Sequence, residues 1–245
     1  MKIKIENLSK IIKKTTVLSN INVSFESGKI YGLAGKNGSG KTMLMRTICG
    51  LIMPSEGNIY FDDKEMHRDF SFPPSLGTLI EYPSFIDSYT GFKNLQIISR
   101  IKNLISDEEI RKTLESVDLD PEDKKSFKKY SLGMKQKLGI ACAIMEKPDL
   151  VILDEPFNAL DENSVNRVKS IILNEKDRGA IVIVSCHDKE DLISLSDEIY
   201  YLRNGCVTTS EVIDHEKEKG LVYKIVSMHH NSLFSCVECI SNNTS

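Results

Sequence analysis

Hydrophobic and polar positions alternate with a period of two near the start of the chain, over residues 2–6 and again over 21–25. Such alternation is typical of antiparallel strands with one packed and one wet face. Residues 28–34 form a short apolar run that enters a glycine-rich turn, and the pattern over 42–49 is helical. With further strands expected at 57–61 and 76–80, the opening of the chain predicts a small β-subdomain beside an α/β unit.

The apolar spacing changes to that of helices from residue 82 to about residue 146. Three acids at 107–109 suit the first turn of a helix. A preceding helix is predicted to bury one face, formed by Leu95, Ile98, Ile101 and Ile105. We interpret this segment as a helical insert.

Uninterrupted apolar runs follow the insert, at 150–153 and 180–184. Such runs are typical of parallel strands buried on both faces, and a helix over 162–175 would provide the right-handed crossover between them. Two last strands, at 198–202 and 206–209, are joined by Asn-Gly, a strong hairpin signal. The whole pattern predicts an α/β fold: a mainly parallel core sheet with an antiparallel β-subdomain and a helical insert.

Composition and charge exclude several classes of protein. Lys and Arg (32) do not outnumber Asp and Glu (35), so we expect no nucleic-acid partner. No apolar run approaches the roughly 20 residues of a transmembrane helix, and the charged first residues do not form a signal segment. We expect a cytoplasmic product whose 245 residues build one large domain.

The six cysteines are scattered, as expected for reduced thiols in a cytosolic enzyme. One group of side chains has the residue types of a zinc site, since His229 and His230 precede Cys236 and Cys239. Adjacent histidines seldom both reach one metal, and the segment lies close to the end of the chain. We therefore favour free side chains over a zinc site.

A phosphate-binding loop is predicted at residues 35–42, between the apolar strand and the helix. Its glycines let backbone N–H groups curl around the β-phosphate of ATP, and the helix N-terminus adds positive potential. Lys41 would reach the β- and γ-phosphates, and Thr42 would offer its hydroxyl to Mg²⁺. A bare glycine-rich turn is the alternative, which the strand–loop–helix setting disfavours. The residues assigned to the nucleotide are Gly35, Asn37, Gly38, Ser39, Gly40, Lys41 and Thr42.

Two adjacent acids, Asp154 and Glu155, end the buried strand at 150–153. In a P-loop sheet this strand end lies beside the phosphate loop, so Asp154 would hold Mg²⁺ through water. Glu155 points elsewhere and would polarise the water that attacks the γ-phosphate. Two acids that merely end a strand at the surface are the structural alternative.

Together, the phosphate loop, residues 153–156, residues 159–161 and His187 resemble an ABC-type nucleotide-binding domain over roughly residues 1–210. The resemblance implies a P-loop NTPase of ABC type with ATP and Mg²⁺ as cofactors. It implies that His187 contacts the γ-phosphate and that Asp161 reaches across a dimer, although Asp161 also suits a helix N-terminus. The insert at 82–146 would be the helical subdomain, and residues 211–245 an extension of unknown role.

The family's signature, usually Leu-Ser-Gly-Gly-Gln, corresponds here to residues 130–134, where only Ser131 and Gly133 keep the pattern. A serine N-cap and a glycine N–H at the start of a helix predicted at 134–145 still make an anion site. The resemblance implies that this site closes on the γ-phosphate bound to a second subunit. An ordinary helix cap is the alternative.

Two departures from the family pattern affect the site. Glu81 stands where most members place glutamine, so the metal set would be Thr42, Glu81 and Asp154. Ile12 stands where an aromatic residue usually stacks on adenine, which predicts a weaker contact or one shared with Val17.

Glu81 and the signature segment together resemble the bacitracin-resistance and lantibiotic-immunity exporters of the family. That resemblance implies an ATPase, homodimeric and peripheral on the inner face of the membrane, which powers a separate permease and exports a peptide antibiotic or similar amphiphile. An aromatic stretch lies where members receive a permease helix, although half of it is compatible with plain insert core: Tyr82, Phe85, Tyr89 and Phe92.

Two other functions are compatible with parts of this pattern. A soluble ABC-type ATPase with a non-membrane partner usually shows a long coiled coil or a second ATPase half, and neither is present in this sequence. An idle nucleotide-binding regulator would not need Lys41, Asp154 and Glu155 together with His187. The transport motor is therefore preferred.

Overall fold

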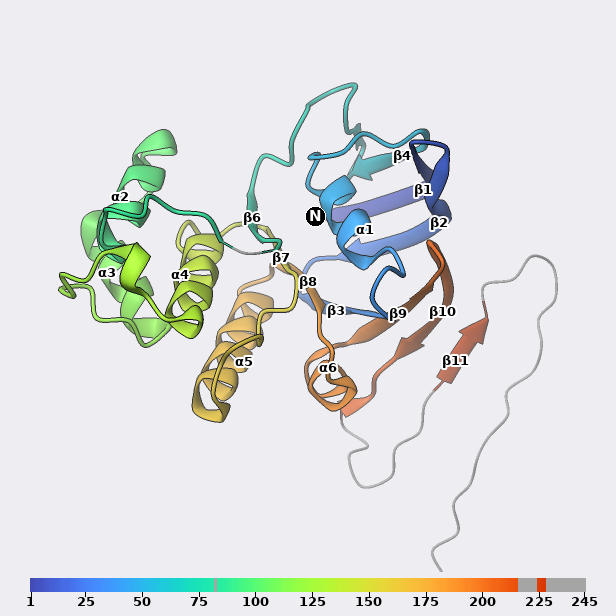
Figure 1. The fold of residues 1–245 in the computed structure, drawn as a ribbon. Helices are drawn as coiled ribbons and strands as arrows, with labels where there is room; N and C mark the ends of the chain where they lie inside the picture. Colours follow the sequence, from blue (N-terminus) through green and yellow to red (C-terminus); the bar gives the residue numbers. More distant parts are fainter. Residues whose placement is uncertain (82, 216–223, 228–245) are drawn as a thin grey trace, which may run out of the picture.

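The computed structural model describes residues 1–81 and 83–215, and the backbone of 224–227. Two β-sheets lie on one side of the molecule with helix α1 (Lys41–Ile48) between them, and α2, α3 and α4 gather on the other side (Figure 1). The fold is α/β with one mainly parallel sheet, as the pattern predicted. Within the described residues, no helix has both the length and the apolar character needed to cross a membrane.

The smaller sheet is antiparallel and has four strands in the order β2-β1-β4-β5. Their bounds are β1 Lys2–Ile12, β2 Thr15–Glu26, β4 Glu56–Phe61 and β5 Lys64–Glu65. Ile3 and Ile5 are buried while Lys2 and Lys4 are exposed, so the alternation of the sequence corresponds to the two faces of β1.

The larger sheet has seven strands in the order β11-β10-β9-β3-β8-β7-β6. The strands from β9 to the edge strand β6 are parallel, while β9–β10 and β10–β11 are antiparallel pairs. The hairpin between β9 and β10 is confirmed, with Asn204 and Gly205 both at positive φ. The strands are β3 Lys29–Ala34, β6 Leu76–Leu79, β7 Leu150–Leu153, β8 Ile181–Ser185, β9 Glu198–Arg203, β10 Cys206–Val212 and β11 Lys224–Ser227.

Both faces of the core sheet are buried. Val151 and Leu153 of β7 belong to one hydrophobic cluster, shared with α4 and α5, while Leu150 and Ile152 belong to the other, around α1. This is why the sequence of β7 is continuously apolar instead of alternating. The same reasoning accounts for β8.

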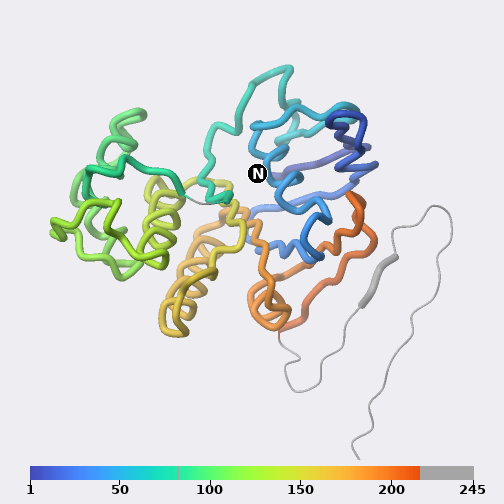
Figure 2. The backbone as a smooth tube through the Cα atoms, viewed as in Figure 1, coloured from blue at the N-terminus to red at the C-terminus, as the bar shows by residue number. Residues whose placement is uncertain are grey.

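The helical insert leaves the core after β6 and returns before β7, as the chain path in Figure 2 shows. Its helices are α2 (Gly91–Lys102), α3 (Asp107–Ser116) and α4 (Leu132–Ile144), with a short 3₁₀ turn at Phe127–Lys129. The crossover helix is α5 (Glu162–Asp177), and α6 (Lys189–Leu195) follows β8. The acids at 107–109 do form the first turn of α3, behind a capping box of Ser106 and Glu109.

One expectation about the insert was wrong. Leu95 is fully buried, but Ile101 is 80% exposed, and Ser99 occupies the buried face in its place. Two successive steps of three residues fall short of two helical turns, so Ile101 has rotated off the face that Leu95 defines. Ile105 is buried beyond the end of α2.

Candidate nucleotide site

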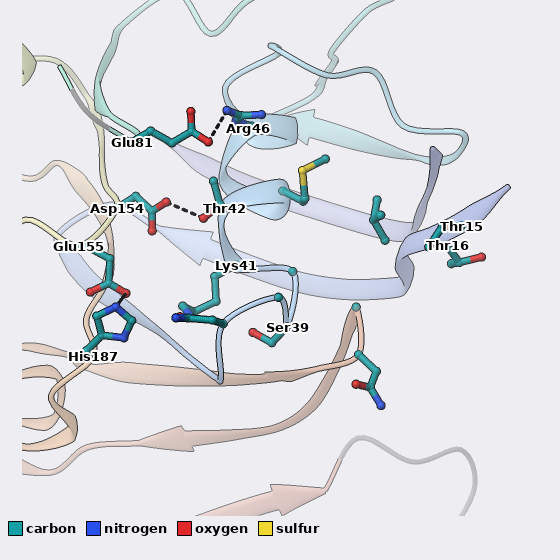
Figure 3. Close-up of a pocket in the computed structure, with 17 residues that line it drawn as sticks. Thr15, Thr16, Ser39, Lys41, Thr42, Arg46, Glu81, Asp154, Glu155 and His187 are labelled. Atoms are coloured by element: carbon teal, nitrogen blue, oxygen red, sulfur yellow. Dashed lines mark hydrogen bonds and ion pairs between the residues drawn. The ribbon is translucent and has the colours of Figure 1, made fainter. Parts of the chain in front are cut away.

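A pocket of about 730 Å³ opens where the phosphate loop, three strand ends and two hairpins meet (Figure 3). It collects residues that are far apart in the sequence, because parallel strands end at one edge of the sheet. The predicted residues that line it are Asn37, Gly38, Ser39, Gly40, Lys41, Thr42, Glu81, Asp154, Glu155 and His187.

The phosphate loop offers an anion site with unused hydrogen-bonding capacity. The Lys41 side chain is buried, and its Nζ donates to the carbonyl of Gly35 at 2.7 Å, which holds the ammonium against the loop. The buried hydroxyl of Ser39 has no partner among the described residues. Gly38 has a φ of +78°, and a Cβ there would meet no atom within 4 Å. An orphaned donor beside an open, left-handed loop fits a bound phosphate.

Asp154 is held by two hydroxyls, one on each oxygen. Thr42 Oγ1 donates to Oδ2 at 2.6 Å, and Ser185 Oγ donates to Oδ1 at 2.5 Å. A carboxylate beside a threonine hydroxyl, facing the phosphate loop, is the oxygen donor set that Mg²⁺ prefers. The residues present therefore fit the metal ion that accompanies ATP.

Glu155 follows Asp154 at a sharp change of backbone direction, with a φ of +52°. Its N–H donates to Ser185 Oγ at 3.0 Å, and the Gln136 side chain donates to its carbonyl at 3.0 Å, which fixes this conformation. The carboxylate lies 3.6 Å from His187 Nε2. Burial raises the pKa of Glu155, and the nearby charges of His187 and Lys41 oppose that rise. A half-buried carboxylate with a raised pKa has the character of a general base.

Glu81 is paired with a residue that the sequence motifs did not identify. The guanidinium Nη2 of Arg46 lies 2.6 Å from Glu81 Oε1. Arg46 follows Thr42 by four residues on α1, and helical residues four apart share a face. The four-residue spacing could have indicated that Arg46 faces the pocket. It could not have indicated the pairing with Glu81, because that also requires β6 to end beside α1.

Ser131, Gly133 and Asp161 are not brought into this pocket. Ser131 caps α4, accepting from the N–H of Met134 at 3.2 Å, so the helix begins at Leu132, two residues before the prediction. Asp161 caps α5 in the same way, and its bonds to Ser164 lower the pKa of its carboxyl. A Cβ on Gly133 would lie 2.9 Å from the carbonyl of Ala159, so the signature segment adjoins the loop that leads to Asp161.

The residues predicted to contact adenine are only partly where we expected them. Ile12 is 37% exposed and does not line the pocket, whereas Val17 does, together with Thr15 and Thr16. Tyr82 lies outside the described residues. So do the four residues considered as zinc ligands, His229, His230, Cys236 and Cys239.

Such a site on a two-lobed α/β fold defines a P-loop ATPase, and comparisons with known proteins identify its family. The ABC transporter family model matches residues 18–158, and the chain belongs to this family. It is 49% identical over 216 residues to YybJ, an uncharacterized ABC transporter ATP-binding protein of Bacillus subtilis, covering 88% of this chain and 99% of the relative.

Two relatives carry a transport name. The bacitracin transport ATP-binding protein BcrA of Enterococcus faecalis is 38% identical, over 83% of this chain and 67% of the relative. The lantibiotic transport ATP-binding protein SrtF of Streptococcus pyogenes is 34% identical, over 86% and 91%. Among solved structures, a dimeric bacterial ABC transporter cassette shares the fold at a TM-score of 0.79 and 22% identity, over 86% of this chain and 99% of that one. The family resemblance is therefore confirmed, and the chain is an ATP-binding transporter subunit that hydrolyses ATP to drive transport.

Proposed function

We propose that this chain is the motor of an exporter of peptide antibiotics of the bacitracin or lantibiotic type, or of a similar amphiphile. The relatives named for bacitracin and lantibiotic transport support this cargo class. In this proposal the chain works on a separate membrane permease and is held by it at the inner face of the membrane. Residues 1–210 would act as the ATP-binding domain, with 82–146 as its helical subdomain.

The arrangement of six side chains around one pocket is the observation that carries the catalytic part. Thr42 and Asp154 would hold Mg²⁺ on one side, with Glu81 near them, and the metal would offset phosphate charge when bound. Glu155 would accept a proton from the attacking water, and His187, 3.6 Å from it, would orient that water toward the γ-phosphate. Lys41 would hold the phosphates from the loop.

We further propose that two copies of the chain work as a pair. The pocket is not lined by Ser131, Gly133 or Asp161. The anion site at the start of α4 therefore does not face the nucleotide that the pocket of the same chain would bind. A second chain whose pocket faced this helix terminus would provide one. Each ATP would then lie between the phosphate loop of one copy and Ser131 of the other.

Expression of this chain together with a candidate permease in a sensitive bacterium tests the proposal. We expect the minimal inhibitory concentration of bacitracin or of a lantibiotic to rise at least about fourfold, and a Lys41→Ala control to abolish the rise because phosphate binding is lost. Cell fractionation provides a second readout. A chain that stays off the membrane in the presence of the permease would favour a soluble ABC-type ATPase with a different partner.

A further inference from the structure

Arg46 lines the nucleotide pocket, yet no motif gives it a task. One face of α1 presents both Thr42 and Arg46 to the pocket. Thr42 donates to Asp154, and Arg46 forms the ion pair with Glu81 (Figure 3). Because β6 and β7 are parallel neighbours, with Leu79 opposite Leu153, the two acids follow adjacent strand ends, and each is held by a residue of α1.

Three carboxylates converge in this pocket, and each is stabilised differently. Asp154 accepts two hydroxyl hydrogen bonds, and Glu155 lies beside His187. The Lys41 ammonium is engaged with the loop carbonyl of Gly35. The ion pair of Glu81 is with Arg46. The phosphates of a nucleotide are strongly anionic, and a Glu81 carboxylate deprived of its cation would add to the repulsion that the other acids of the pocket already exert on them.

The position of Glu81 is constrained as well as charged. Its φ is +62°, a region that residues other than glycine rarely adopt. It stands two residues after the end of β6, where the chain leaves the core for the insert. Figure 3 shows the Glu81 carboxylate directed to the Arg46 guanidinium on α1. The ion pair fixes the end of this side chain, and strained backbone conformations tend to occur at functional sites.

We propose that Arg46 is a positioning residue, which neutralises Glu81 and holds its carboxylate at the α1 wall so that the pocket accepts nucleotide phosphates before a metal ion arrives. The inference rests on the proposed nucleotide role of this pocket. A glutamine at position 81 carries no charge and would not need the cation. Arg46 and Glu81 are therefore coupled: the requirement for Arg46 exists because residue 81 is an acid.

A double-mutant cycle on the full chain tests this coupling through binding. The affinity for a fluorescent ADP analogue is measured in EDTA for wild type, Arg46→Gln, Glu81→Gln and the double variant. We expect Arg46→Gln to weaken binding at least about fivefold and the double variant to return to within about twofold of wild type, because removing the acid removes the repulsion. Added Mg²⁺ should shrink the loss in Arg46→Gln, since the metal offsets the exposed carboxylate.

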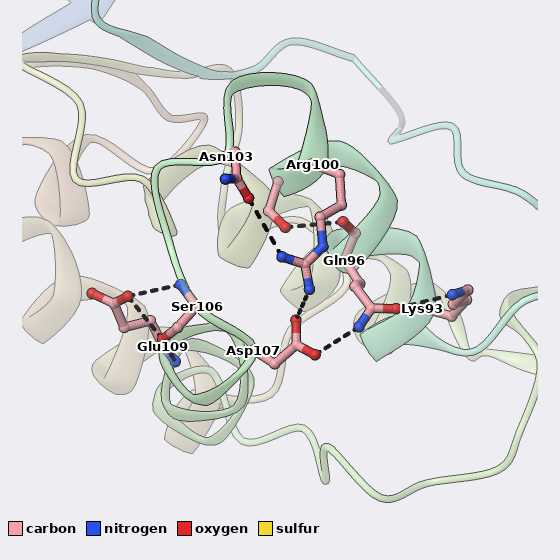
Figure 4. Close-up of polar contacts among 8 residues, drawn as sticks. Lys93, Gln96, Arg100, Asn103, Ser106, Asp107 and Glu109 are labelled. Carbon is pink, nitrogen blue, oxygen red and sulfur yellow. Dashed lines mark hydrogen bonds and ion pairs between the residues drawn. The ribbon is translucent and has the colours of Figure 1, made fainter.

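Two further variants separate charge from structure. Arg46→Lys keeps the charge and should bind within about threefold of wild type. Arg100→Gln is a matched control, because Arg100 forms a comparable exposed ion pair with Asp107, at 2.8 Å, within the insert (Figure 4). It should leave the affinity unchanged.

Three outcomes would overturn the inference. A double variant that binds as weakly as Arg46→Gln would mean that Arg46 binds phosphate directly. Wild-type affinity in Arg46→Gln, or a loss in Arg46→Lys as large as that in Arg46→Gln, would also contradict it. Failure of the wild-type chain to bind the nucleotide at all would instead refute the proposed role of the pocket. The two failures are thus distinguishable.

Discussion

Glu155 combines a strained backbone, a raised pKa and a position beside His187. The strained backbone and the burial that raises the pKa each have a cost for folding, and such costs tend to be retained at functional positions. Asp154, one residue earlier, is instead held by Thr42 and Ser185. The change of backbone direction between two adjacent acids thus separates a candidate metal ligand from a candidate base.

Replacement of Glu155 by glutamine should separate binding from hydrolysis. The amide keeps the shape of the side chain but cannot take a proton. We expect Glu155→Gln to bind ATP with near wild-type affinity and to lose at least about 100-fold in turnover. Its ATP-bound form should accumulate as a dimer in size-exclusion chromatography, because the shared nucleotides are not cleaved. Turnover at the wild-type rate would refute the role assigned to Glu155.

The raised pKa of Glu155 also predicts how pH affects stability. Between the ordinary value of 4.5 and the raised value, the native chain holds a proton that the unfolded chain has lost. The free energy of unfolding therefore falls as pH rises through that window. Glu155→Gln removes this contribution, so the melting temperature of the variant minus that of the wild type should rise as pH increases above 4.5 in nucleotide-free protein. A difference that is constant with pH would show that the carboxyl titrates normally.

At the scale of elements, the sequence predicted those features whose cause is local. The phosphate loop, the buried β7 and β8, and the acidic first turn of α3 all follow from residue type and spacing over a few positions. The Arg46–Glu81 pair depends on how α1 and β6 meet in space, and the position of Ile101 depends on which neighbours cover α2. Those relations are set by tertiary packing, which spacing alone does not specify.

A comparison of two serine caps tests whether Ser131 has a role in ATP hydrolysis beyond capping α4. Ser131 caps α4 and Ser106 caps α3, each through its hydroxyl and the N–H three residues on. Either change to alanine should cost about 1 kcal/mol of unfolding free energy. Only Ser131→Ala should also lower ATPase activity of the assembled pair, by at least about tenfold, if its hydroxyl meets the partner's nucleotide. Equal effects of both variants on activity would make Ser131 an ordinary cap.

At the scale of the whole molecule, the insert is tightly joined to the pocket. A Cβ on Gly77 of β6 would lie 1.7 Å from the carbonyl of Ala143, and one on Gly139 of α4 would lie 2.8 Å from Leu79. These glycines let α4 pack directly onto β6. The helix α4, with Ser131 at its N-terminus, and the strand β6, which is followed by Glu81 at the pocket, therefore form one packed unit. We expect a movement of the insert to displace both Ser131 and Glu81, which would link the bound nucleotide to the surface of the insert.

The aromatic stretch at the start of the insert divides into core and surface. Phe85 packs on the insert core, with its ring 5.2 Å from that of Phe127, and Phe92 is also partly buried there. Tyr89 is 39% exposed, which leaves it available for a permease helix. The structure therefore favours the core interpretation for Phe85 and keeps the docking hypothesis for Tyr89.

This division predicts opposite effects for two substitutions. Phe85→Ala should lower the free energy of unfolding by about 1–3 kcal/mol, less than the loss of a fully buried phenylalanine. Tyr89→Ala should melt like the wild type and keep the ATPase rate of the isolated chain within about twofold, but should weaken co-purification with the permease at least about fivefold, because an exposed aromatic is a typical interface anchor. Leu104→Ala removes another exposed apolar side chain of the insert and serves as the matched control. If Leu104→Ala weakens co-purification as much as Tyr89→Ala does, the permease does not dock specifically at Tyr89.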